Sequence, residues 1–199
     1  MVKLHWRRST VLPLNKSKPR YYITQQQLYL ITETQLEPLG QLSELFSSTE
    51  LAEPSFVFLG ADCYEIFINS AEQSYDPAQF KKQNQSHFLQ HFPHLDVEDY
   101  QLFFDQPQFN QPYLGIAIEK QWLEALKQYL VKRKFFNTNI QPLATYLFRN
   151  DLTQEQAFSC LEPLAETIFI KVNHVLDMIL CKPRAETTTL AFQTWMDIK

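Results

Sequence analysis

The pattern of apolar and polar positions is most regular in the second half of the chain. Residues 113–118 alternate large apolar side chains with small ones, which is typical of a strand packed closely against a neighbour. Residues 119–132 place apolar side chains at helical spacing on one face and charged side chains on the other. We therefore expect a strand and then a helix that covers one face of a sheet, followed by a short helix from Pro142 to Phe148.

The first half of the chain predicts short strands joined by tight turns. Residues 20–31 contain two apolar runs separated by a polar tip, which predicts a β-hairpin. Residues 55–59 are almost entirely apolar, as in a buried central strand, and residues 64–69 alternate in the manner of a following strand. Residues 2–8 predict a further strand, and the spacing of leucine and phenylalanine predicts a short helix over residues 41–47.

The middle of the chain contains a helix start and a boundary between lobes. Asp76 is placed to cap a helix whose first turn holds Pro77. Residues 105–112 are mostly polar and include two prolines, which favours a connection between lobes. We therefore divide the chain into a first α/β lobe of residues 1–107 and a second of residues 108–199.

The second lobe predicts one more helix and three more strands. Residues 153–161 begin with a capping-box pattern, which predicts a short helix. Residues 168–172 and 175–181 carry apolar side chains at strand spacing and predict a hairpin. Residues 187–195 are rich in threonine, leucine and aromatic side chains and predict a last strand.

Composition excludes several function classes. The formal net charge is -4, so the chain has no global basic field for nucleic acid or acidic lipid, and a protein is the expected partner. The chain has only 3 glycines, which argues against a glycine-rich phosphate loop and against nucleotide binding. The 3 cysteines form no CxxC pair, as in a reducing compartment, and no stretch has the length of a signal-peptide core or a membrane span. We expect a cytoplasmic protein.

Three histidines form the best candidate for a metal site. His87 and His91 are four residues apart on one predicted helix face, and His94 follows shortly after. Three imidazoles are a common ligand set for zinc. The sequence has no glutamate base between the first two histidines, and the histidines flank phenylalanines, so we favour half-buried histidines packed against aromatic rings.

Candidate nucleophiles lack a motif around them. Cys63 stands beside Asp62, and Cys160 would need a distant histidine as its base. Glu98 and Asp99 are adjacent, but the surrounding polar residues indicate a solvated edge rather than an acid/base pair. We therefore do not expect an enzyme, and we expect no bound cofactor or metal.

One basic cluster stands out on the acidic chain. Lys127, Lys132, Arg133 and Lys134 lie at or near the end of the helix predicted over residues 119–132. Such a cluster can steer an acidic partner surface and raise its association rate. The alternative is a solvated helix end whose positive charges complement the helix dipole. We treat the four residues as a candidate partner-binding site.

Three segments carry a resemblance to a known family: FVFLGADCYEIFINSAEQSYD, DVEDYQLFF and YLGIAIEKQWLEALKQYLVKRKFFNTNIQPLATYLF. Their order resembles the cytoplasmic domain of the type II (general) secretion pathway protein L, and it is similar to pilus-assembly protein M. The resemblance covers about Tyr21 to Cys181. It implies a two-lobed, actin-like (ribonuclease H-like) α/β fold with mixed sheets covered by helices.

The resemblance also implies a function and partners. It implies a non-enzymatic scaffold on the cytoplasmic side of the bacterial inner membrane, which docks the secretion ATPase through that enzyme's N-terminal domain. Other proteins of the inner-membrane platform are implied partners, and a second copy of the chain is a candidate partner for a homodimer.

The turns of this sequence depart from an actin-like nucleotide site. Such a site needs a carboxylate and glycine amides in a turn of each lobe. The turns that we match to those positions are residues 60–62, Gly-Ala-Asp, and residues 172–174, Val-Asn-His, and neither has the required order. We therefore expect no ATP binding. The alternative, implied by the pilus relatives, is an actin-like scaffold that binds ATP and the cytoplasmic tail of a membrane partner.

Overall fold

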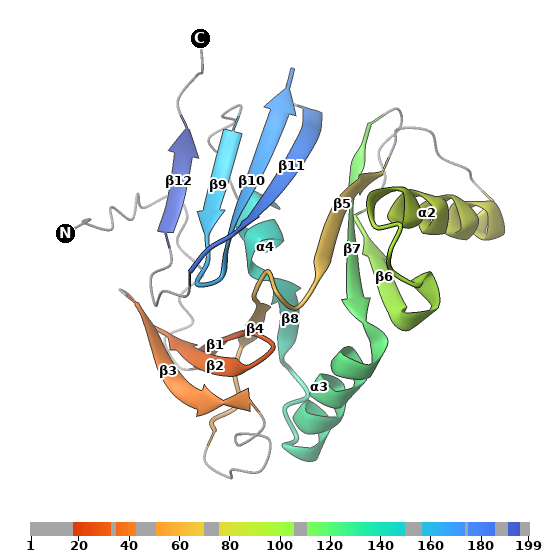
Figure 1. Ribbon diagram of the computed structural model, residues 1–199. Coiled ribbons are helices and arrows are strands. Elements are labelled where there is room, and N and C mark those ends of the chain that lie inside the picture. The colour runs from red at the N-terminus through yellow and green to blue at the C-terminus, as the bar shows by residue number, and fades with distance from the viewer. Residues whose placement is uncertain are drawn as a thin grey trace.

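The computed structural model describes residues 18–32, 35–42, 51–69, 76–105, 111–149, 157–173, 175–185 and the backbone of 191–195. These residues form three β-sheets and three α-helices, arranged as in Figure 1. The strand predicted over residues 2–8 lies outside the described residues.

The first sheet has five strands in the order β3-β2-β1-β4-β8. Its strands are β1 (Arg20–Ile23), β2 (Gln27–Ile31), β3 (Leu36–Gln41), β4 (Phe56–Leu59) and β8 (Asn139–Pro142). Strands β1, β2 and β3 form an antiparallel meander, and β4 and β8 extend the sheet in parallel beside β1. Central strands of this kind are buried on both faces, which explains the unbroken apolar runs that predicted them.

The second sheet has four antiparallel strands in the order β11-β10-β9-β12. They are β9 (Ala157–Leu161), β10 (Ala165–Val172), β11 (Val175–Pro183) and β12 (Ala191–Trp195). The order repeats that of the first sheet: β9, β10 and β11 form a meander, as β1, β2 and β3 do. The next strand, β12, then pairs with β9, as β4 pairs with β1. The repeat is inexact, since β12 runs antiparallel to β9 whereas β4 runs parallel to β1.

The third sheet has the order β5-β7-β6 and is covered by a helix. Its antiparallel strands are β5 (Glu65–Asn69), β6 (Tyr100–Phe104) and β7 (Tyr113–Glu119). Helix α2 (Pro77–His91) packs Phe88 against Phe67 of β5, with ring centroids 5.7 Å apart. Asp76 caps α2 by accepting a hydrogen bond from the amide of Ala78, as predicted. A short 3₁₀ helix, η2 (Val97–Asp99), leads into β6.

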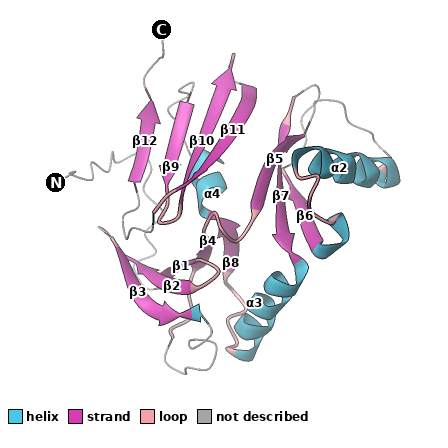
Figure 2. Cartoon of the chain, viewed as in Figure 1, coloured by secondary structure: helices cyan, strands magenta, loops and turns pink. Residues whose placement is uncertain are grey.

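The other two helices pack against the sheets (Figure 2). Helix α3 (Lys120–Lys132) buries Leu123, Leu126 and Leu130 against Tyr21 and Val57 of the five-stranded sheet. This is the amphipathic helix that the sequence predicted. Its apolar stripe is therefore the face that covers the sheet.

Helix α4 (Leu143–Arg149) links the five-stranded and four-stranded sheets through one apolar core. Its fully buried Leu143 and Leu147 share a cluster with Phe58 of β4 and Phe169 of β10. The ring of Phe148 stacks on that of Phe169 with centroids 4.3 Å apart. Because apolar burial is the main favourable term in folding, α4 is a principal connection between the two sheets.

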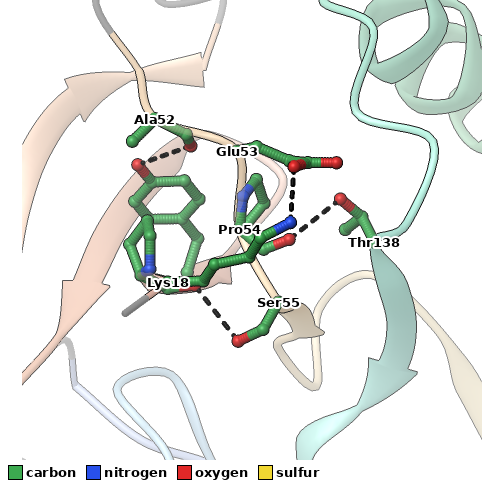
Figure 3. Close-up of polar contacts among 8 residues, drawn as sticks. Lys18, Ala52, Glu53, Pro54, Ser55 and Thr138 are labelled. Carbon is green, nitrogen blue, oxygen red and sulfur yellow. Dashed lines mark hydrogen bonds and ion pairs between the residues drawn. The ribbon is translucent and has the colours of Figure 1, made fainter. Parts of the chain in front are cut away.

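Polar contacts hold together the segments that lead into β1, β4 and β8 (Figure 3). The ammonium group of Lys18 pairs with the carboxylate of Glu53, and the hydroxyl of Thr138 donates to the carbonyl of Pro54 at 3.1 Å. The three segments are far apart in sequence. Their contacts therefore support the register of the parallel strands that follow.

One predicted helix is wrong, and the error has a physical cause. Residues 157–161 form strand β9, because pairing with β10 and β12 outweighs the local capping signal that predicted a helix. The short helix predicted from Pro142 to Phe148 is confirmed as α4 (Leu143–Arg149). It begins one residue later than predicted because Pro142 ends the edge strand β8, where a missing N–H is tolerated. Strand β3 ends at Gln41 and Leu42 is helical, but most of the helix predicted over residues 41–47 lies outside the described residues.

The division at residues 107 and 108 stays a prediction, but the sheets do not separate there. Strand β7 follows this point in sequence and pairs with both β5 and β6, which precede it. Strand β8 likewise joins the five-stranded sheet beside β4. Two sheets therefore contain strands from both sides of the predicted boundary.

The close approach of β5 and β7 yields a stability prediction. A Cβ at Gly115 would lie 2.5 Å from Cζ of Phe67 and 2.8 Å from Nδ2 of Asn69. We expect Gly115→Ala to lower the free energy of unfolding by about 1–3 kcal/mol, because overpacking forces the neighbours to move. Urea denaturation measures the change.

The matched control for this prediction is a double variant. Phe67→Leu alone should be destabilising, but the combination of Gly115→Ala with Phe67→Leu should cost less than the sum of the two single changes. If the two changes in the free energy of unfolding are strictly additive, the contact between Phe67 and residue 115 does not determine the cost of Gly115→Ala.

Candidate functional site

Three turns meet where the five-stranded and four-stranded sheets approach each other. They are residues 24–26 between β1 and β2, residues 60–64 between β4 and β5, and residues 162–164 between β9 and β10. The first and third turns are equivalent, because each joins the first two strands of a meander. We call their meeting point the junction.

Glu162 lies at the centre of the junction and is fully buried. Its Oε2 accepts hydrogen bonds from the Tyr22 hydroxyl at 2.9 Å and from the Ala61 amide at 3.1 Å, while its Oε1 has no hydrogen-bond partner among the described residues. Arg184 donates to the backbone carbonyl of Glu162 and not to its carboxyl group. A Cβ at Gly60 would lie 2.5 Å from the Tyr22 hydroxyl, so this close approach requires glycine.

The environment of Glu162 keeps its carboxyl group protonated at neutral pH. Burial raises the pKa of Glu162 to about 8, although the hydrogen bonds from Tyr22 and Ala61 act in the opposite direction. The Tyr64 hydroxyl also acts to lower the pKa of Glu162, although its contact with the carboxyl group falls outside ordinary hydrogen-bond geometry. The junction therefore holds a neutral acid between two sheets.

The backbone amides of the junction donate to groups of the protein itself. The amide of Gln25 donates to the Asp62 carboxylate at 2.8 Å, and the amides of Gln26 and Gln27 donate to the Thr24 hydroxyl. Burial raises the pKa of Asp62, which the Gln25 amide partly offsets. A phosphate group would need free amides and would meet two carboxyl groups instead. The described residues thus form a closed polar contact rather than an anion cradle.

The sequence located one of the junction turns and missed the other. Residues 60–62 lie at the junction as expected, but Val172 and Asn173 lie at the opposite end of β10, so their assignment to the second turn is wrong. His174 is outside the described residues. The second turn is residues 162–164, which the mistaken helix over 153–161 concealed. Glu162 was missed for the same reason, and the contact that Tyr22 makes with it was missed as a consequence.

The predicted basic cluster lies at the end of α3. Lys127 forms an exposed ion pair with a glutamate one turn earlier, and the Arg133 guanidinium lies 5.5 Å from the centre of the Tyr129 ring. Lys132 and Lys134 are exposed. Two of the four charges are thus engaged within the protein, and partner binding by the cluster stays a prediction.

The three histidines do not converge. His87 Nδ1 lies 3.1 Å from the Asn69 side-chain oxygen, and His91 Nε2 lies 3.1 Å from the Ile68 carbonyl. His87 is half-buried as expected, whereas His91 and His94 are exposed. Within the described ranges, no three His, Cys, Asp or Glu side chains are placed to hold a metal ion.

The cysteines lie in unreactive settings. Burial raises the pKa of the Cys63 and Cys160 thiols well above the usual range, and nearby carboxyl groups raise it further. Reactive cysteines need an exposed, electropositive environment. Cys181 is exposed, and burial of part of its side chain still raises its thiol pKa. The expectation that the chain is not an enzyme stays a prediction.

The buried carboxyl of Glu162 yields a prediction about pH. The folded-state pKa of about 8 exceeds the ordinary value of 4.5, so the folded state keeps a proton that the unfolded state loses, and stability falls as pH rises from 4.5 to 8. Glu162→Gln should abolish this contribution, whose limiting slope is about 1.4 kcal/mol per pH unit. An amide can keep both accepted hydrogen bonds and place its NH₂ group at the unpartnered position. Urea denaturation between pH 5 and about 8.5 checks this.

Glu124→Gln is the matched control, because Glu124 is exposed on α3. A plot of its free energy of unfolding against pH should run parallel to that of the unmodified chain. If the curve of Glu162→Gln is parallel as well, Glu162 is not a neutral buried acid.

None of the described helices is long and apolar enough to cross a membrane.

No protein-family model and no curated protein matches the chain. Solved structures similar to it include a chain of the PilM–PilN type IV pilus biogenesis complex, with a TM-score of 0.50 and 8% identity over 82% of this chain and 60% of that one. They also include the cytoplasmic domain of EpsL, an inner-membrane component of the type II secretion system of Vibrio cholerae, with a TM-score of 0.47 and 14% identity over 88% and 70% of the two chains. A Bacteroides thetaiotaomicron protein with an actin-like ATPase fold and unknown function has a TM-score of 0.47 and 10% identity over 88% and 74%.

The similarity to the pilus-complex chain establishes the fold. The fold class predicted from the sequence, a two-lobed, actin-like α/β fold with mixed sheets covered by helices, is confirmed. Both families that the sequence resembles, the secretion protein and the pilus protein, are represented among these structures.

Proposed function

We propose that the chain is a non-enzymatic scaffold of an inner-membrane platform for secretion or pilus assembly, acting on the cytoplasmic side. The supporting observation is the junction: in a fold shared with a pilus-complex chain, a buried neutral Glu162 and self-satisfied turn amides stand between the two sheets. Such a junction favours protein binding over phosphate chemistry.

The finer form of this proposal is that the scaffold docks the N-terminal domain of a secretion ATPase. The end of α3 is a suitable surface, because exposed Lys132 and Lys134 border exposed Val131 and Phe136. The side chains of Val131 and Phe136 are 60% and 70% exposed. Apolar side chains rimmed by charge are typical of protein interfaces, and the basic rim would attract an acidic partner. Other platform proteins would then bind elsewhere on the scaffold.

The second candidate is an actin-like pilus scaffold that binds ATP and the cytoplasmic tail of a membrane partner. It draws support from the similarity to the pilus-complex chain. It differs from the first candidate by requiring that the junction open to admit a nucleotide.

Calorimetric titration with the N-terminal domain of the cognate secretion ATPase, together with association kinetics by stopped-flow mixing, tests the docking proposal. We expect saturable binding, and we expect Lys132→Glu combined with Lys134→Glu to slow association and to weaken its dependence on salt. Arg133 stays unchanged because it lies over Tyr129. The matched control reverses Lys81 and Lys82, two exposed lysines on α2. Equal on-rates for both double variants across a salt series would move the interface away from α3.

Thermal unfolding with Mg-ATP separates the two candidates. A ligand present at about 100 times its dissociation constant stabilises a protein by roughly 2.7 kcal/mol. We expect no shift, because the turn amides already donate to Asp62, Glu162 and Thr24. A shift that rises with ATP concentration would favour the pilus-type scaffold.

A further inference from the structure

Two edge strands from different sheets lie side by side (Figure 1). They are β5, at the edge of the three-stranded sheet, and β11, at the edge of the four-stranded sheet. Neither pairs with a further strand among the described residues. Edge strands present unpaired N–H and C=O groups that can bind another chain. The space between β5 and β11 therefore has an edge strand on each side, and the Ile68 carbonyl of β5 already contacts His91.

Two hollows lie along β5 and β11. One hollow of about 360 Å³ lies beside Leu176 and Asp177, and another of about 240 Å³ lies beside Glu65 and Cys181. His91 borders both hollows, and we call the two hollows together the seam groove.

The seam groove carries negative charge without a lysine or arginine among its lining residues. Glu65 lines one hollow and Asp177 lines the other. Charge complementarity therefore favours a basic group in the groove.

The hollow beside Glu65 also contains two buried hydroxyl groups whose nearest polar contacts, Tyr64 with Glu162 and Thr167 with Cys181, fall outside ordinary hydrogen-bond geometry. Tyr64 and Thr167 line it and are only 6% and 1% exposed. Neither hydroxyl has a hydrogen-bond partner of ordinary geometry among the described residues. Buried polar groups are normally satisfied, and hydroxyl and carboxyl oxygens are suitable acceptors for an ammonium or guanidinium group. The hollow thus has the acceptors that a basic side chain requires.

A β-bulge places Asp177 in the groove wall. Ile170 pairs with Met178 and Lys171 pairs with Leu176, so Asp177 is the extra residue of β11. A bulge at a sheet edge redirects a side chain and interrupts regular pairing. The bulge therefore supplies a carboxylate at the far end of the groove from Glu65.

We propose that the seam groove binds an extended segment of a partner protein, and that a Lys or Arg side chain of this segment enters the hollow lined by Tyr64, Glu65 and Thr167. Edge backbone groups of β5 and β11 supply main-chain hydrogen bonds, and Asp177 supplies a second charge. The inference rests on the proposed function in that the ligand is a protein, but it concerns a surface separate from α3.

Selection from a displayed library of random peptides of about twelve residues tests the proposal on the folded chain. We expect the enriched peptides to share a Lys or Arg. Replacing that residue by norleucine in the tightest synthetic peptide should weaken binding about tenfold in calorimetry. Glu65→Gln combined with Asp177→Asn should weaken it by a similar factor.

The matched control is Glu37→Gln combined with Glu124→Gln, which changes the net charge equally at exposed positions away from the groove. It should leave the peptide affinity unchanged. The proposal is overturned if no peptide binds saturably, if the enriched peptides lack a basic residue, or if the groove variant binds as tightly as the control. The ATPase titration at α3 is independent, so either result can fail without the other.

Discussion

The contact of Glu162 with Tyr22 and Ala61 is the constraint on which the rest of this structure depends. Burying an ionised carboxylate away from any cation is costly, and a buried acid avoids that cost by keeping its proton. The neutral acid can then lie between the two sheets while α4 joins them through apolar packing. The position that could admit an anion is occupied by the protein's own acidic side chain.

A closed junction leaves the surface of the fold for binding. The end of α3 offers exposed lysines beside exposed apolar side chains, and the seam groove offers carboxylates, buried hydroxyls and strand edges. These surfaces lie on different elements and have opposite charge. Under the proposed function, these two surfaces would bind two partners of different chemistry.

Local signals predicted the elements that depend on local interactions. The cap at Asp76, the stripe of α3 and the hairpin of residues 20–31 all appear where the sequence placed them. Strand β9 was mistaken for a helix because its identity depends on β10 and β12, whose pairing is invisible in a window of a few residues. Glu162 was missed with it, since its partners Tyr22 and Ala61 lie more than a hundred residues earlier in the chain.

The pKa of Glu162 is the most direct test of this account. Carbon-13 NMR of side-chain carboxyl groups, assigned by comparison with Glu162→Gln, follows the protonation of this residue in the folded chain. The account predicts a midpoint of about 8 for Glu162. A midpoint near the ordinary value of 4.5 would mean that the carboxyl is solvated or paired with a cation, and that the junction is not closed as described.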